Sequence, residues 1–482
     1  MSTLKRFFKD TVIYGLAAVL PRALNIILVH LKTNTFEPDK YSEDTKYYIY
    51  AAYFNVLLTY GLETAFFRFF TKEKEKGKVI STSFISISIT TLTFLFIALF
   101  FSDAISEFVG FSNPLFVKLL IITLVLDTLV VIPYAYLRVT NRPIKFTFFK
   151  VSNIIIYVGL AYFFLWFVPK YKLELPKIFI SNLGKSPQVI YIFLAGVIAS
   201  LFTFLTMLPI IFKFKFTFDK VIFKKLLVYG LPIMIGGLAF VTNENFDKIL
   251  IEKINGKEQM GIYAACYKLG VFMTIFIMAF RLGAEPFFFK IAEDKDAKEK
   301  YATILNWFTI FGSLFMFIIV AYINIFTVLI GKEAFLEALN IVPIILLANL
   351  FLGIYNNLSI WYKLTDKTKY GMYFSIIGAI ITISLNIIFI PIYGYIAAAW
   401  TTLIVYFIMT VTSYIYGKKY YKIPYQVLKV GFYLLLSVVF SAISFYTDFR
   451  ENYYISTLLL FLFIGIIYLK EKKTIKQITN SN

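Results

Sequence analysis

Long apolar runs, separated by short polar and mostly basic segments, are the dominant pattern along the 482 residues of this chain. A helix needs about 20 apolar residues to cross the hydrocarbon core of a bilayer. By that length, the pattern predicts an all-α polytopic membrane protein with about fourteen transmembrane helices. The predicted spans are Thr11–Thr33, Tyr47–Phe70, Val79–Phe101, Leu115–Leu137, Phe146–Val168, Val189–Phe212, Leu226–Ile249, Met260–Phe280, Ala302–Ile330, Ala338–Tyr362, Tyr370–Ile392, Tyr395–Tyr416, Val427–Phe445 and Tyr453–Leu469.

The connections between these runs are short. The longest, Pro169–Gln188, has about twenty residues and contains Pro, Gly and Lys, so we expect it to be an outer loop. No connection leaves room for a soluble catalytic domain, and we therefore do not expect an enzyme. A membrane polysaccharide polymerase or ligase would need a sizeable outer loop for its catalytic residues, which makes that alternative the weaker one.

The distribution of basic residues predicts the orientation of the chain. There are 48 Lys and Arg against 28 Asp and Glu, a formal net charge of +20. In a soluble protein this excess would suggest a nucleic-acid partner. Here Lys and Arg concentrate in alternate connections, as the positive-inside rule describes for cytoplasmic loops. We therefore predict that both termini are cytoplasmic, and we expect no nucleic-acid partner.

Three short sequence motifs each occur twice, in the same order and roughly half the chain apart. The pairs are Tyr14–Leu16 with Tyr229–Leu231, Ile49–Ala52 with Ile262–Ala265, and Thr140–Arg142 with Thr365–Lys367. Together they indicate a duplicated unit. In a membrane protein, duplication is the usual architecture of a transporter, with the substrate site between the repeats.

The duplication predicts the domain organisation. Residues 1–212 form an N-terminal six-helix half, 213–225 a cytoplasmic linker, 226–416 a C-terminal six-helix half, and 417–482 the last two helices with a cytoplasmic tail. Six spans separate the two starts, so both halves begin on the same side of the membrane. The repeats are therefore expected to be parallel.

Cysteine and histidine are almost absent. The chain has one of each, Cys266 and His30, so an internal disulfide is impossible and a Cys/His metal site is nearly excluded. Ser-His-Asp catalysis would have to use His30, which lies within a predicted span. We expect no cofactor.

Basic residues inside predicted spans are the candidate substrate ligands. Arg22 directly follows Pro21, and a charge at that depth costs about 2.5–3.5 kcal/mol to insert. Such cations suit an anionic substrate, because arginine matches phosphate with paired donors. Three of these cations also have a purely structural alternative. Arg22 would pair with a carboxylate for packing, Arg68 would extend its charged end to the membrane interface, and Arg281 would form an i,i+4 ion pair with Glu285. The predicted substrate-binding residues are Arg22, Arg68, Lys268 and Arg281.

Carboxylates inside predicted spans are the candidate ion-coupling residues for H⁺ or Na⁺. The alternative for Glu63 is an ion pair with Arg22 or Arg68. The alternative for Asp127 is an ion pair with an arginine that the sequence does not identify. Glu244 and Asp247 share one helix face and repel unless one holds a proton or cation. The alternative is that both are wet at the outer interface, which we expect for Asp247. The candidates are thus Glu63, Asp127, Glu244 and Asp247.

These motifs resemble a known family. Tyr14–Leu16 leading into Arg22, the stretch Gly61–Arg68, and the series Tyr229–Pro232, Asp247-Lys248 and Gly261–Tyr263 are similar to those of polysaccharide flippases. These flippases belong to the multidrug/oligosaccharidyl-lipid/polysaccharide exporter superfamily. The resemblance covers nearly the whole chain and implies a MATE-like fold.

The resemblance implies a flippase in a bacterial inner membrane. It would move an undecaprenyl-diphosphate-linked oligosaccharide, as for surface polysaccharide or lipopolysaccharide, from the inner to the outer leaflet. Arg22 and Arg68 match arginine positions of the family, whereas Lys268 and Arg281 come from charge reasoning. A lipid II flippase and a cation-coupled exporter are the alternatives within the superfamily, although a drug exporter for cations should have an acidic cavity.

Two positions depart from the family pattern. Glu244 stands where the family has an asparagine. Ser42 stands where the family usually has a glycine in a turn after the first helix, whereas the second half keeps Gly261.

Overall fold

A computed structural model describes residues 3–173 and 187–480. Within these residues every regular element is helical, which confirms the predicted all-α class. The chain divides into two compact units, Met1–Ala265 and Cys266–Asn482. The boundary between the predicted repeats, at 213–225, stays a prediction, and the first unit continues past it to include α12.

The first unit contains the helices up to α13. These are α1 (Thr3–Thr35), α2 (Pro38–Thr59), α3 (Leu62–Lys72), α4 (Lys76–Phe100), α5 (Ser102–Val109), α6 (Pro114–Leu129), α7 (Val131–Val139), α8 (Pro143–Tyr162), the π-helix η1 (Phe163–Phe167), α9 (Val168–Lys170), α11 (Pro187–Ile211), α12 (Lys220–Asn255) and α13 (Lys257–Tyr267).

The second unit begins in the last turn of α13. Its further elements are η2 (Lys268–Gly270), α14 (Val271–Lys290), α15 (Ala297–Ala321), α16 (Ile323–Phe326), η3 (Thr327–Leu329), η4 (Glu333–Ile341), α17 (Val342–Leu358), α18 (Ile360–Leu364), α19 (Lys369–Tyr393), α20 (Tyr395–Tyr420), α21 (Val427–Tyr446), η5 (Asp448–Glu451) and α22 (Tyr453–Asn480).

Twelve helical segments in the described residues are long and apolar enough to cross a membrane, which confirms a polytopic membrane protein. They begin with Lys76–Phe100 and end with Tyr453–Lys472. The first two predicted spans fall on α1 and on the pair α2–α3, which are helical but are not among the twelve. The count of fourteen therefore stays a prediction.

Large apolar side chains face outward on many of these helices. Phe96, Phe100 and Leu428 are 72%, 83% and 92% exposed. A soluble protein rarely exposes apolar surface on this scale, whereas lipid tails would cover it. The pattern of exposure therefore agrees with the hydropathy.

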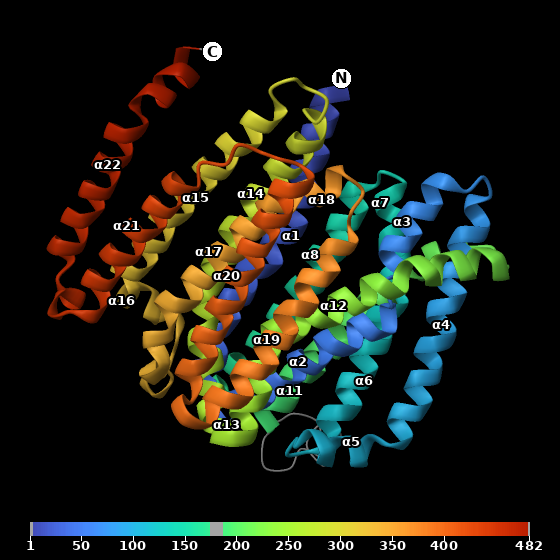
Figure 1. Cartoon of the computed structure of the whole chain (residues 1–482). Helices are drawn as coiled ribbons and strands as arrows, with labels where there is room; N and C mark the ends of the chain where they lie inside the picture. The colour runs from blue at the N-terminus through green and yellow to red at the C-terminus, as the bar shows by residue number, and fades with distance from the viewer. Residues whose placement is uncertain (1–2, 174–186, 481–482) are drawn as a thin grey trace. The chain divides into compact units, whose positions relative to one another are not determined.

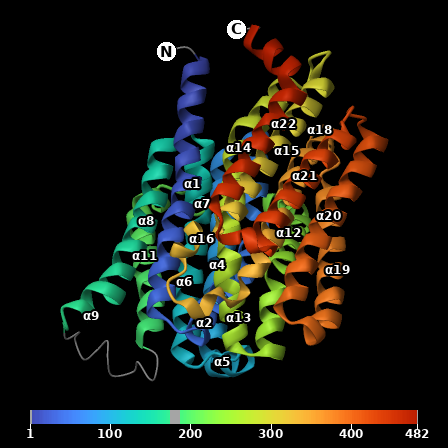
Figure 2. The ribbon, with the colours of Figure 1, turned by 90° about the vertical axis from the view of Figure 1, so that its left-hand side faces the viewer.

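Helix α12 is the centre of packing in the first unit. It lies along α2, α3 and α4, as Figure 1 shows, while α8 packs against both α1 and α11 (Figure 2). A core of buried aromatic and aliphatic residues joins α3, α4, α7 and the start of α12, among them Phe66, Ile132 and Leu226.

In the second unit, α17 packs against α15 and α20, and α19 packs against α20. Helices α21 and α22 pack against α15 (Figure 1). Trp361, 1% exposed, stacks on Tyr420 and anchors the core of α17, α18 and α20.

The repeated motif Thr140–Arg142 and its counterpart Thr365–Lys367 adopt the same turn. Asn141 and Asp366 both have positive φ, 51° and 56°. The amides of the following residues, Arg142 and Lys367, each donate to a carbonyl five positions back, at 2.9 Å. This is the Schellman arrangement that ends a helix. The two halves thus end their fourth and tenth predicted spans by one device.

Candidate functional site

Two glycines bring α3 and α12 into backbone contact. Tyr60 and Gly61 have positive φ, 32° and 72°, and separate α2 from α3. A Cβ placed on Gly61 would lie 2.2 Å from the carbonyl oxygen of Gly230. Only glycine fits there, because a side chain would occupy the space of that carbonyl. This crossing sets the positions of Glu63 and Arg68 relative to α12.

Arg68 lies against α12. Its exposed guanidinium is 4.4 Å from the centre of the Tyr229 ring, and Phe69 meets the same ring edge-on. The side chains here surround a cavity of about 460 Å³, which we call the basic pocket. Its lining residues are Arg68, Phe69, Lys72, Val221, Lys224, Lys225, Val228 and Tyr229.

Glu63 pairs with a residue that sequence reasoning did not propose. Its Oε1 atom lies 3.3 Å from Arg138 of α7, whose guanidinium also lies over the ring of Phe67. The expected partners were Arg22 and Arg68, so this pairing prediction was wrong. Arg138 reaches Glu63 because α3 and α7 pack together. Both side chains are more than two-fifths exposed.

Asp127 is an accessible carboxylate on α6. Its nearest polar neighbours are Ser200 of α11, which hydrogen-bonds to it, and Lys150 of α8. Lys150 also lies 4.2 Å from the centre of the Tyr134 ring. An arginine partner was one of the two expectations for Asp127, and the basic residue that acts on it electrostatically is Lys150.

Asp247 is buried, at 1% exposure, so the expectation that it is wet was wrong. Tyr263 of α13 donates a hydrogen bond of 2.6 Å to its Oδ2 atom, and Lys248 lies 3.2 Å from Oδ1. The Lys248 ammonium also donates to the carbonyl of Glu244 at 2.7 Å. Helix α13 covers this face of α12, which a count of residues along one helix cannot anticipate.

A cluster of charges, here called the buried charge cluster, lies where α12 ends. Asp44 accepts from Lys32 at 2.9 Å, and Lys46 lies 2.5 Å from Glu252 and donates to the Gly110 carbonyl. Its six members are Lys32, Glu43, Asp44, Lys46, Glu252 and Lys257, the last paired with Glu43. Lys32, Glu43, Asp44 and Lys46 are each no more than 6% exposed.

Sequence reasoning missed this cluster because it assigned most of these residues to a connection. The stretch around Ser42 is the start of α2 rather than a turn, and the Ser42 hydroxyl donates to the Asp39 carbonyl at 2.6 Å. The glycine of the second half, Gly261, touches this same place, since its Cβ would lie 1.9 Å from the Pro38 carbonyl oxygen. The close succession of two acidic residues, Glu43 and Asp44, and the basic Lys46 was the available signal.

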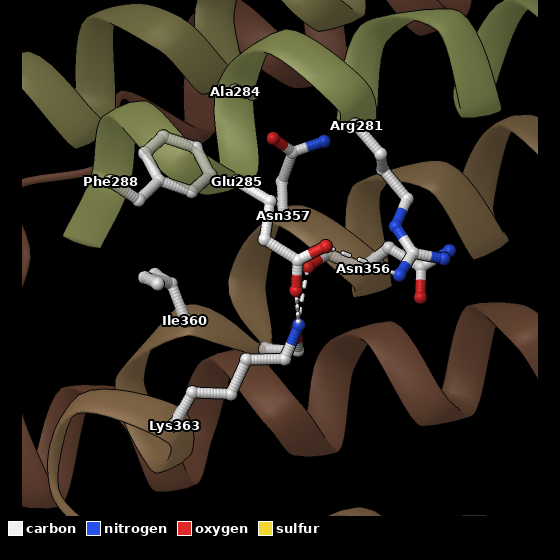
Figure 3. A pocket seen from close by; sticks show the side chains of 9 residues that line it. Arg281, Ala284, Glu285, Phe288, Asn356, Asn357, Ile360 and Lys363 are labelled. Atoms are coloured by element: carbon white, nitrogen blue, oxygen red, sulfur yellow. Dashed lines mark hydrogen bonds and ion pairs between the residues drawn. The ribbon is translucent and has the colours of Figure 1, made fainter. Parts of the chain in front are cut away.

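In the second unit, Arg281 is one of two cations on a single carboxylate. Its guanidinium lies 3.4 Å from Glu285, the i,i+4 pair that the spacing allowed. Lys363 of α18 binds the other oxygen of Glu285 at 2.5 Å, and Figure 3 shows Glu285 between the two. Asn356 and Asn357 line the same small pocket.

Lys268 opens a break in the helix. The 3₁₀ segment η2 separates α13 from α14, and Lys268 is exposed at its start. Asn349 of α17 donates to the Gly270 carbonyl at 3.2 Å, satisfying a backbone group at the break. Mid-helix 3₁₀ segments often mark hinges.

Arg22 is exposed on α1, directly after Pro21, inside a helix of 33 residues. Arg22 is not among the residues that line the basic pocket. Of the predicted site residues, the structure brings Glu244 and Asp247 to one stretch of α12. The remaining ones lie at separate positions within their own units.

Comparison with known proteins identifies the fold. The lipid II flippase MurJ in an inward closed conformation matches with a TM-score of 0.73 and 20% identity, over 95% of this chain and 99% of that one. An inward-facing multidrug resistance MATE family transporter matches with a TM-score of 0.64 and 12% identity, over 83% of this chain and 94% of that one. A MOP superfamily transporter from Pyrococcus furiosus, described by a binding pocket of reverse polarity, gives 0.58 and 13%, over 85% and 95%.

The class is therefore a multi-span membrane protein with the fold shared by MurJ and the MATE transporters of the MOP superfamily. Residues 7–292 match the family of polysaccharide biosynthesis proteins, and residues 232–388 also match the MatE family. The first match covers more than half of the chain, and the chain belongs to the polysaccharide biosynthesis protein family. No curated protein matches it by sequence.

Proposed function

We propose that this protein is a flippase that moves a polyprenyl-diphosphate-linked oligosaccharide from the inner to the outer leaflet of a bacterial inner membrane. The observation that carries the proposal is Arg22, an exposed arginine beside Pro21 within the first predicted span. Hydrocarbon does not tolerate an exposed guanidinium at that depth. The face of α1 that carries it therefore suits a wet cavity with an anionic cargo. Membership in a polysaccharide biosynthesis family supports the same cargo.

The chemistry follows from the guanidinium. Arg22 offers planar paired donors that match two oxygens of a diphosphate. The oligosaccharide would occupy the wet cavity while the polyprenyl tail stays in lipid. An inside-negative potential helps to move an anionic head group outward, by about 2.3 kcal/mol per charge per 100 mV. Lys268 and Arg281 are proposed as further cations along the path.

The proposed mechanism is alternating access with both termini cytoplasmic. The buried charge cluster joins α2, from the first predicted repeat, to α12 and α13, from the second, at their predicted outer ends. Outward opening would require those contacts to separate. Return of H⁺ or Na⁺ through a carboxylate would reset the carrier, and Asp127 suits this role best because it is accessible and has Lys150 beside it.

The test replaces Arg22 by alanine in cells that depend on this gene for surface glycan. We expect surface glycan to fall about tenfold or more at equal protein level, since an arginine–phosphate contact is charge-assisted on both sides. Lipid-linked oligosaccharide should accumulate in the inner leaflet. Arg142→Ala, an exposed arginine in the α7–α8 turn, is the matched control and should leave glycan unchanged. Unchanged glycan in the Arg22→Ala cells would remove the docking role.

Lipid II is a second candidate cargo, favoured by the MurJ-like fold. Rescue of cells depleted of their own lipid II flippase would support it. Failure to rescue, together with accumulation of another lipid-linked oligosaccharide when this gene is deleted, would exclude it.

A further inference from the structure

We propose that the basic pocket binds the phosphate-bearing head group of a membrane lipid. The pocket lies between α3 and the start of α12, in the first unit, and none of the functions above needs it. Two lipids could supply such a head group, an anionic phospholipid of the bilayer and a polyprenyl diphosphate. Binding of either would join α3 to α12.

The pocket carries an excess of positive charge. Four cations line it, Arg68, Lys72, Lys224 and Lys225. Within the described residues, the carboxylates that compensate them both act on Lys225: Glu73 accepts from it at 2.7 Å, and Asp219 interacts with it electrostatically. Three cations therefore face the cavity without an acidic partner. Like charges held this close repel one another, and an anion between them would relieve that repulsion.

The stacking of Arg68 prepares it for a phosphate. The guanidinium lies over the face of Tyr229, which Phe69 holds from the side by an edge-on contact. A guanidinium is planar and carries its N–H donors around its edge, where they match phosphate oxygens in pairs. The ring also limits the rotamers of Arg68, so less conformational freedom is lost when it binds.

The rim of the pocket favours a lipid over a free anion. Val221 and Val228 belong to the lining and are 66% and 68% exposed. Apolar side chains beside cations suit a ligand with a charged head and an apolar tail. By the predicted topology the pocket opens at the cytoplasmic interface, where basic pockets bind lipid head groups.

The size of the pocket fits this ligand. About 460 Å³ lies within the range of pockets that enclose small-molecule groups, so it can hold a phosphate or diphosphate with part of its glycerol or prenyl stem. The proposal does not depend on the transported cargo, because it concerns binding in place rather than movement across the membrane.

The experiment uses the purified full-length protein in a neutral detergent and measures binding by native mass spectrometry. The probes are phosphatidylglycerol, undecaprenyl diphosphate, diacylglycerol and inorganic pyrophosphate. We expect one-to-one binding of the phosphate-bearing lipids and none of diacylglycerol, which has the same tails without the phosphate. If undecaprenyl diphosphate binds more tightly than phosphatidylglycerol, the ligand is the head group of a cargo lipid. If the two lipids bind with similar affinity, the ligand is a phospholipid of the bilayer.

The variant Lys72→Gln/Lys224→Gln removes two of the three uncompensated charges without touching the Arg68–Tyr229 stack. We expect the dissociation constant for phosphatidylglycerol to rise on the order of tenfold or more. The matched control is Lys74→Gln/Lys215→Gln, which makes the same change in net charge at exposed lysines outside the pocket. Its dissociation constant should stay within about twofold of the wild type. Lys72→Arg/Lys224→Arg should keep binding close to wild type.

Several outcomes would overturn the proposal. Equal binding of diacylglycerol and phosphatidylglycerol would show that only the tails are recognised. Pyrophosphate bound as tightly as the lipids would assign the pocket to a free anion. An equal loss of lipid affinity in Lys72→Gln/Lys224→Gln and in the control Lys74→Gln/Lys215→Gln would indicate diffuse electrostatic attraction to the protein surface. If Lys72→Gln/Lys224→Gln does not fold, the salt dependence of lipid binding by the wild-type protein is the test. Binding that does not weaken with rising salt would contradict a charge-based site.

Discussion

The two ends of α12 both meet lysines, and the lysines differ in what surrounds them. Where α12 ends, Lys46 is 1% exposed and lies 2.5 Å from Glu252. Where α12 begins, Lys224 is exposed and lines the basic pocket with Arg68, Lys72 and Lys225, of which Lys225 pairs with Glu73. A matched, buried charge holds helices together, whereas an excess of accessible charge is available to a ligand. The same residue type thus has a structural role at one end and a recognition role at the other.

Close glycine contacts are a feature that the two regions share. Gly261 meets the Pro38 carbonyl beside the buried charge cluster, and Gly61 meets the Gly230 carbonyl near the basic pocket. Both contacts bring backbones together, α3 to α12 near the basic pocket and α13 to α2 beside the buried charge cluster. The two regions therefore differ in their charges and not in how closely their helices pack.

The largest expected effect is the loss of Lys46. Lys46→Ala leaves Glu252 largely buried without its partner and the Gly110 carbonyl without its donor. Breaking a buried pair in this way costs about 3–5 kcal/mol, and we expect a large fall in the thermal unfolding temperature of the purified protein. Lys253→Ala, at an exposed neighbour of Glu252, should change stability by no more than about 0.5 kcal/mol.

A double variant separates the charge from the packing. Lys46→Met/Glu252→Met removes both charges together and should recover part of the stability, because neither is then left alone in the interior. If it is no more stable than Lys46→Ala, the structural role assigned to the buried charge cluster is contradicted.

The next effect tests the crossing near the basic pocket. Gly61→Ala adds a Cβ within 2.2 Å of the Gly230 carbonyl at a φ of 72°. Strain in the left-handed region and overpacking together should cost about 2–5 kcal/mol. Gly110→Ala is the matched control, since Gly110 has the same left-handed conformation with a φ of 76° and its Cβ would meet nothing closer than the Lys46 ammonium at 3.7 Å, and it should cost about 1–2 kcal/mol. Equal losses in unfolding temperature would show that the contact with Gly230 does not matter.

The smallest effect concerns an exposed ion pair of the same unit. Glu63→Gln removes the contact with Arg138, and both side chains are more than two-fifths exposed. Exposed pairs contribute about 0–1 kcal/mol, and added salt should abolish what difference there is. A loss as large as that of Lys46→Ala would break the comparison, because burial would then not decide the worth of a charge.

The helical architecture could be predicted from the sequence because hydropathy is a local property. Each predicted span falls on one helix or on up to three consecutive helical elements, and the i,i+4 pair of Arg281 and Glu285 is present. The echo between Thr140–Arg142 and Thr365–Lys367 also has a local basis, a positive φ at the central residue.

The partners of the charges could not be predicted, because they are set by packing between distant segments. Glu43 and Lys257 are 214 positions apart, and no spacing rule relates them. Asp247 was expected to be wet because it lies toward a helix end, but Tyr263 covers it. Arg22, Arg68, Lys268 and Arg281 were proposed as one cationic site, and the structure gives Arg68 and Arg281 different surroundings.

The lone cysteine has a practical consequence. Cys266 is buried in the helical interior, and its thiol donates to the Phe335 carbonyl at 3.0 Å. The natural chain is thus close to a cysteine-free background for site-directed labelling. Single substitutions such as Lys74→Cys, after α3, and Lys253→Cys, near the end of α12, would place a reactive thiol at exposed positions. A maleimide that cannot cross the membrane would then report, from each side in turn, the direction in which α12 runs through the bilayer.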